Sequence, residues 1–164
     1  MAEKTYLPEG ASVPPSQIGV TIEALAATIA ARREAGEESY THRLLTGSED
    51  DLLKKVVEEA CEVALAAKDC ERFMLASRET AEARALDEGA EEAPSAVEVP
   101  AGYDGSVDHL RYEAADVVYH VLVVLERYGI ALDEFAAELN NRMTDEERPE
   151  GGVMLFDEYV RRGK

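Results

Sequence analysis

Residues 108–128 read DHLRYEAADVVYHVLVVLERY and have the pattern of a helix that is buried around most of its circumference. At about 100° per residue, its ionisable side chains fall within about 60° of one helix face. They are His109, Glu113, Asp116, His120 and Arg127. Most other positions are Leu, Val, Ala or Tyr, whereas a surface helix has a broad polar face. Burying carboxylates without partners costs roughly several kcal/mol, so basic side chains or a metal ion must neutralise this stripe.

A second predicted helix, residues 48–68, also presents carboxylates at helical spacing. Ser48 suits its N-cap, and the acidic residues that follow complement the helix dipole. An E-E-x-x-E motif and one lysine share a sector of about 100° on the helical wheel; they are Glu58, Glu59, Glu62 and Lys55. We expect the opposite half to pack into the core. It contains Leu52, Leu53, Val56, Val57, Ala60, Cys61, Val63 and Ala64, with Cys61 as a small buried residue.

The length and composition predict an all-α protein, a bundle of four to five helices in one domain. The chain has 164 residues, 6% aromatics and no Trp, and this length suffices for one core. Further amphipathic helices are predicted at 21–34 and 132–143. Helix 108–128 is apolar around more of its surface than one small subunit covers, so we expect an obligate homodimer.

Proline, glycine and charge distribution predict three regions. Residues 1–20 form an arm, residues 21–143 form the all-α domain, and residues 144–164 form a tail. Residues 77–107 are an acidic insertion rich in Ala and Glu; its first part extends a helix, and its second part, with several prolines and glycines, is a loop.

The net charge of −18, from 35 acidic and 17 basic residues, argues against binding to nucleic acid or to an anionic membrane. A phosphorylated substrate remains compatible, because a bound cation inverts the local sign of the charge. Adaptation to high salt is a further hypothesis, which a melting curve without stabilisation in molar KCl would contradict. The N-terminus has no apolar targeting segment, and Cys61 and Cys70 match no metal-ligand or redox spacing. We therefore expect a cytoplasmic protein.

If the two helices pack face to face, up to five carboxylates converge. Such crowding raises their pKa values, and a hard divalent cation relieves it. An all-oxygen set favours Mg²⁺, with Mn²⁺ as the alternative, over Zn²⁺. However, E-E-x-x-E alone is also typical of a solvated helix face, with Lys54–Glu58 and Lys55–Glu59 as ordinary pairs. The carboxylates at Glu113 and Asp116 are more informative, because they interrupt an apolar helix.

Two further features each have two interpretations. His120, one turn after Asp116, either is a satisfied core histidine or orients that carboxylate or contacts substrate. In GEESYTHRLLTGS, residues 36–48, the side chains Ser39, Tyr40, Thr41 and Arg43 together suit an anion. Composition favours the simpler interpretation of this segment, an interhelical connection with a capping Ser or Thr.

Two stretches together resemble the phosphoribosyl-ATP pyrophosphohydrolases of histidine biosynthesis. They are KKVVEEACEVALAAK at 54–68 and YEAADVVYHVLVVLERYGIALDEFAAEL at 112–139. The carboxylate pattern is shared with the wider all-α NTP pyrophosphohydrolases, including MazG and the dimeric dUTPases. The SYT segment 39–41, Lys55 and the run around His120 point to the histidine branch. The resemblance covers 21–143, although 77–107 lengthens the usual spacing between the two motifs.

The resemblance implies Mg²⁺-dependent hydrolysis of phosphoribosyl-ATP to phosphoribosyl-AMP and pyrophosphate. The implied metal ligands are Glu58, Glu59, Glu62, Glu113 and Asp116. Catalytic roles fall to Glu59, Glu62 and Asp116, with the general base left open among the carboxylates. The implied substrate-binding residues are Ser39, Tyr40, Thr41, Lys55 and His120, with Arg43 a weaker candidate.

Two other functions compete with this one. A MazG-type pyrophosphohydrolase acting on free or non-standard nucleotides shares the carboxylates but does not require the SYT segment. An acidic helical interaction module requires no specific Mg²⁺ binding, but leaves the buried Glu113 and Asp116 unexplained.

Overall fold

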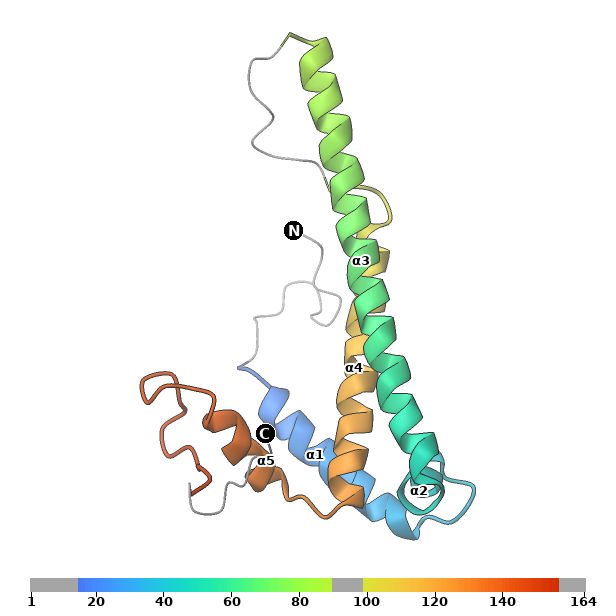
Figure 1. Ribbon diagram of the computed structural model, residues 1–164, viewed down its shortest axis with the longest axis vertical. Coiled ribbons are helices and arrows are strands. Elements are labelled where there is room, and N and C mark those ends of the chain that lie inside the picture. Colours follow the sequence, from blue (N-terminus) through green and yellow to red (C-terminus); the bar gives the residue numbers. More distant parts are fainter. Residues whose placement is uncertain (1–14, 90–98, 157–164) are drawn as a thin grey trace. The chain divides into compact units, whose positions relative to one another are not determined.

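The computed structural model describes residues 15–89 and 99–156, which contain five α-helices and no β-strand. The helices are α1 (Ile18–Ala31), α2 (Tyr40–Thr46), α3 (Glu49–Asp87), α4 (Tyr103–Arg127) and α5 (Leu132–Asn140), shown in Figure 1. A 3-10 turn, Arg32–Glu34, follows α1. The predicted all-α class and helix number are confirmed.

The described residues divide into two compact units. Residues 53–89 and 99–120 belong to the first, and residues 15–52 and 121–156 to the second. Parts of the predicted arm, insertion and tail, at 1–14, 90–98 and 157–164, lie outside the described residues. The predicted boundaries at residues 20 and 143 stay predictions.

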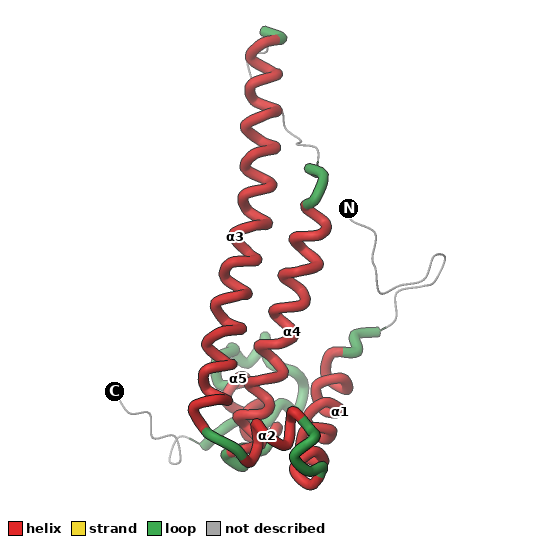
Figure 2. The backbone as a smooth tube through the Cα atoms, turned by 90° about the vertical axis from the view of Figure 1, so that its right-hand side faces the viewer, coloured by secondary structure: helices red, strands yellow, loops and turns green. Residues whose placement is uncertain are grey.

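In the first unit, α3 and α4 lie side by side and run in opposite directions (Figures 1 and 2). Helix α3 has 39 residues, because the predicted helix at 48–68 continues through the Ala-rich start of the insertion. The predicted helical extension is therefore confirmed. The N-terminus of α4 follows Gly102, whose φ is +93°, and a Cβ there would lie 3.2 Å from the Phe73 ring of α3. Only glycine meets both conditions without strain.

The first unit buries mainly polar side chains. Glu59, Ser106, Glu113 and His120 are buried, while Ala66 and Cys70 are the buried apolar residues among those described there. Part of the apolar half of α3 is open to solvent in the single chain: Val57 is 63% and Leu53 is 40% exposed.

The prediction of a buried Cys61 is wrong, because Cys61 is exposed. The rest of the apolar half of α3 is buried only in part, since Leu52 is fully buried whereas Val57 is exposed. The physical reason is the orientation of α3 about its own axis. Its glutamate sector faces α4, so the opposite, apolar sector faces away.

The second unit has an apolar core, formed by Ile29, Leu44, Leu45, Leu52, Leu122, Val123 and Ala137. Arg127 donates hydrogen bonds to the carbonyl oxygens of Leu44 at 2.7 Å and Gly47 at 2.9 Å. Both carbonyl groups lie at the C-terminal end of α2, where the last carbonyls of a helix have no partner within it. The Arg33 guanidinium pairs with Glu126 at 3.0 Å. Polar side chains thus join the end of α4 to α2 and to the turn after α1.

None of the described helices is both long enough and apolar enough to cross a membrane.

Candidate functional site

Three carboxylates meet between α3 and α4 in the first unit. Glu59, Glu113 and Asp116 each offer one oxygen, and these oxygens lie within 4.8 Å of one another. Glu59 is 5% exposed and Glu113 is 7% exposed, while Asp116 is half-buried. The i,i+3 spacing of Glu113 and Asp116 places both on the face of α4 that meets Glu59. We call these three side chains the carboxylate cluster.

Basic side chains compensate part of this charge. Lys55 Nζ lies 3.1 Å from Glu58 Oε2 and 3.4 Å from Glu59 Oε1. The hydrogen bond to Glu58 raises the pKa of Lys55, although burial acts in the opposite direction. His109 Nε2 lies 2.8 Å from Glu113 Oε1. Within the described part of the chain, the Asp116 carboxylate has neither a hydrogen-bond nor an ion-pair partner.

The other two predicted ligands have different surroundings. Glu58 is exposed and pairs with Lys55, outside the cluster. Glu62 is half-buried, and burial is the largest cause of its raised pKa. A hydrogen bond with Glu59 and the negative charge of Glu113 raise that pKa further. Glu62 therefore experiences the crowding of like charges that the motif spacing predicts, whereas Glu58 is held at the surface.

His120 is 4% exposed and hydrogen-bonded to its own helix. Its Nδ1 lies 2.9 Å from the Asp116 carbonyl oxygen, and because a carbonyl only accepts, Nδ1 carries the proton in this contact. The same nitrogen is 3.9 Å from Glu59 Oε1, and the Tyr119 ring meets the imidazole edge-on. These contacts support the interpretation of a satisfied core histidine that also fixes its ring beside the cluster.

The SYT segment lies in the second unit, at the start of α2. The Ser39 hydroxyl accepts a hydrogen bond from the His42 backbone N–H at 3.3 Å, which makes Ser39 the N-cap of α2. Arg43 donates to the Glu37 carbonyl oxygen at 2.7 Å. Tyr40 is exposed and Thr41 is half-buried. The predicted capping serine is confirmed, and an anion-binding role for the segment stays a prediction.

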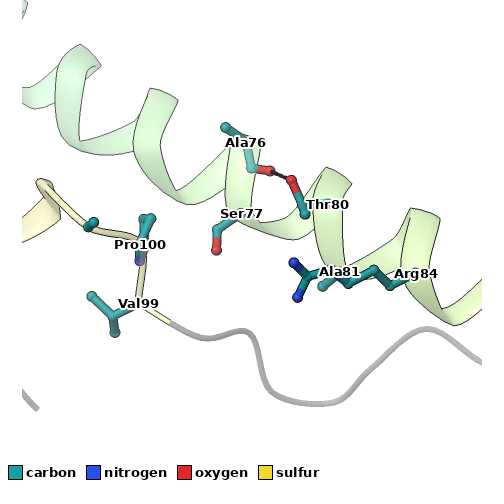
Figure 3. Close-up of a pocket in the computed structure, with 8 residues that line it drawn as sticks. Ala76, Ser77, Thr80, Ala81, Arg84, Val99 and Pro100 are labelled. Atoms are coloured by element: carbon teal, nitrogen blue, oxygen red, sulfur yellow. Dashed lines mark hydrogen bonds between the residues drawn. The ribbon is translucent and has the colours of Figure 1, made fainter.

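A hollow of about 370 Å³ lies between the C-terminal part of α3 and the segment before α4 (Figure 3). Ser77, Thr80, Arg84, Val99 and Pro100 line it, and it shares no residue with the carboxylate cluster. The Thr80 hydroxyl donates to the Ala76 carbonyl oxygen at 2.8 Å. The described residues that line this hollow include no carboxylate, thiol or imidazole, whereas the cluster brings three carboxylates together. We therefore take the cluster as the candidate site.

Sequence reasoning missed the roles of two residues on the ionisable stripe. It placed His109 and Arg127 on the correct face but assigned neither a partner. For His109 a signal existed, because Glu113 follows at i+4, the spacing of neighbours on a helix. For Arg127 the local sequence held no signal, since its partners are backbone carbonyls of α2.

The fold and the site together define an all-α protein with a carboxylate centre buried between two antiparallel helices. The phosphoribosyl-ATP pyrophosphohydrolase family matches residues 22–143, and the chain belongs to this family. The predicted resemblance and its extent are thus confirmed.

Relatives named phosphoribosyl-ATP pyrophosphatase match most of the chain. The protein from Dechloromonas aromatica (strain RCB) is 29% identical over 140 residues, which cover 85% of this chain and 90% of the relative. The protein from Erythrobacter litoralis (strain HTCC2594) is 31% identical over 144 residues, which cover 87% of this chain and 97% of the relative. The protein from Acidovorax sp. (strain JS42) is 35% identical over 122 residues, which cover 72% of this chain and 69% of the relative. No solved structure matches the chain.

Proposed function

We propose that this protein hydrolyses the α–β phosphoanhydride of phosphoribosyl-ATP, giving phosphoribosyl-AMP and pyrophosphate in an early step of histidine biosynthesis. The observation that carries the proposal is the carboxylate cluster of Glu59, Glu113 and Asp116, within a segment that matches the family. An interaction module has no need to bury these charges against one another, because each costs free energy unless it is compensated.

The cluster fits a hard divalent cation. Its donors are all carboxylate oxygens, and nothing in the described chain engages the Asp116 carboxylate. Burial raises the pKa of the neighbouring Glu62, and its contacts with Glu59 and Glu113 raise that pKa further. Glu59, Glu113 and Asp116 would hold Mg²⁺, or alternatively Mn²⁺, with Glu62 and Glu58 as the further ligands of the motif. Such an ion neutralises phosphate charge and lowers the pKa of a bound water.

The chain's own residues then have three tasks. A carboxylate among Glu59, Glu62 and Asp116 accepts the proton of the attacking water. Lys55 forms ion pairs with Glu58 and Glu59. When substrate binds, Lys55 leaves one of these carboxylates and pairs with a substrate phosphate. His120 and the SYT residues Ser39, Tyr40 and Thr41 bind other parts of the substrate. Catalysis in this scheme consists mostly of positioning and charge stabilisation.

The test is pyrophosphate release from phosphoribosyl-ATP, with and without Mg²⁺, beside dCTP, dUTP and ITP. We expect Mg²⁺-dependent release from phosphoribosyl-ATP alone. Release only from the other nucleotides would instead establish the MazG-type alternative, which shares the carboxylates. Absence of any Mg²⁺-dependent release would refute both enzymatic functions.

We also propose that the protein functions as a homodimer that covers the apolar half of α3. Val57 is more than half exposed in the single chain, and Leu53 and Cys61 of the same half are exposed as well. The first unit buries little apolar surface of its own, so packing within one chain contributes little hydrophobic stabilisation to it. A second copy of the same helix face supplies the missing cover, as in isologous dimers.

A further inference from the structure

We propose that His109 is a positioning residue for Glu113, which it holds in the orientation needed to bind a divalent cation. This inference rests on the proposed function, because it concerns the carboxylate cluster of that function. It adds a residue to which neither the motif spacing nor the family resemblance assigns a role.

The contact joins two side chains in different surroundings. His109 Nε2 lies 2.8 Å from Glu113 Oε1, one helical turn apart on α4; the imidazole is 57% exposed and the carboxylate side chain 9%. The imidazole therefore reaches from the solvent edge of α4 to a carboxylate inside the cluster. Since a carboxylate at that distance accepts a hydrogen bond, Nε2–H is the donor.

Glu113 has fewer basic partners than Glu59, the other buried carboxylate of the cluster. Glu59 has both Lys55 and His120 beside it. In the described part of the chain, His109 is the only side chain that pairs with the Glu113 carboxylate. The neighbours of Glu113 inside the cluster are all acidic, and their repulsion favours rotation of this flexible side chain away from them.

A hydrogen bond to one carboxylate oxygen opposes that rotation and leaves the remaining lone pairs available to a cation. Outer partners of metal-binding side chains act in this way, and their removal costs about 10- to 100-fold in metal affinity. Without His109, Glu113 must be reoriented each time the cation binds, so affinity falls while the groups that perform the reaction remain.

The test measures Mn²⁺ binding to the full chain without substrate, from the electron paramagnetic resonance signal of free Mn²⁺. We expect His109→Ala to weaken binding about 10-fold, and His109→Gln, which keeps an N–H donor, to recover part of the loss. Arg111→Ala is the matched control, because it removes a neighbouring cation that pairs with Asp108 and not with the cluster. It should leave binding within about twofold, as expected for an exposed charge.

Kinetics give an independent measurement. In pyrophosphate release, His109→Ala should raise the Mg²⁺ concentration for half-maximal rate about 10-fold and leave kcat at saturating Mg²⁺ near that of the wild type. A purely structural role would instead lower the melting temperature without shifting the Mg²⁺ dependence.

The outcomes separate the inference from the proposed function. Equal Mn²⁺ affinity of His109→Ala and the wild type overturns the role of His109 and leaves the proposed function intact. An equal loss in Arg111→Ala also overturns it, because the effect is then one of general surface charge. A wild-type protein that binds no Mn²⁺ overturns this inference together with the metal site.

Discussion

Glu59 and Asp116 differ in what surrounds them, although both belong to the carboxylate cluster. Glu59 is buried, with Lys55 and His120 as neighbours, whereas Asp116 is half-buried. In the metal-free protein, removing either negative charge relieves repulsion. With substrate and metal present, the same change removes a ligand. Stability and activity should therefore respond in opposite directions.

Glu59→Gln and Asp116→Asn should each lower turnover on the order of 100-fold or more. The free energy of unfolding in the absence of metal should stay constant or rise. Pyrophosphate release and chemical denaturation measure the two quantities. Glu71→Gln is the control, because Glu71 is an exposed residue of α3 that pairs with Lys68. Near-normal rates in both cluster variants would refute the site.

Ser39 caps α2 and is also proposed to bind substrate, and two substitutions separate these roles. Ser39→Ala removes the cap and should cost about 1 kcal/mol in unfolding free energy. Ser39→Asp keeps a capping oxygen but adds a negative charge. We expect Ser39→Asp to retain the wild-type melting temperature and to raise KM for phosphoribosyl-ATP, because the charge repels phosphate. An unchanged KM would restrict Ser39 to capping.

At the scale of elements, the antiparallel pairing of α3 and α4 brings the two motifs together. Helix α3 continues to Asp87 and the chain returns to begin α4 at Tyr103. Gly102, at this return, lies against Phe73 of α3 with a positive φ. The pairing therefore depends on a backbone conformation that other residues rarely adopt.

Gly102→Ala should lower the unfolding free energy by more than Gly89→Ala. Both glycines have positive φ, but a Cβ at Gly102 meets the Phe73 ring at 3.2 Å, whereas a Cβ at Gly89 meets no atom within 4 Å. The Gly89 variant therefore measures only the cost of placing a residue with a Cβ at positive φ, about 1 kcal/mol. The additional loss in the Gly102 variant measures the cost of the close contact between its Cβ and the Phe73 ring. Thermal denaturation of both proteins tests this; equal losses would contradict close packing at Gly102.

At the scale of the whole molecule, the chain combines a net charge of −18 with an apolar helix face open to solvent. Like net charges oppose association of two copies, so burial of apolar surface must outweigh their repulsion. Val57 is the large side chain of this face with the greatest exposure, followed by Leu53.

Val57→Glu should convert a dimer into a monomer, because it places a charge on the face that we propose is covered. Like charges brought together in an interface cost roughly several kcal/mol. Sedimentation equilibrium measures the association. Ala83→Glu is the control, since it adds the same charge at an exposed position of α3 in the insertion. A wild-type protein that sediments as a stable monomer at low concentration would refute the dimer.

The sequence alone was sufficient for the all-α class, the two carboxylate motifs and the family, because these depend on local properties. Helical periodicity determines which side chains share a face, so Glu113, Asp116 and His120 could be placed together from their spacing. The cap at Ser39 and the extension of α3 likewise follow from residues adjacent in the chain.

The tertiary structure decided which face of each helix meets which neighbour. A helical wheel shows that α3 has a glutamate sector and an apolar sector, but not which of them faces α4. The packing of α3 on α4 turned the glutamates inward, selected Glu59 over Glu58 for the cluster and left Cys61 exposed. Burial is a property of the assembled elements, since it depends on atoms far away in the sequence. For this reason the spacing predicted the groups that perform the chemistry, and only the fold determined which of them meet.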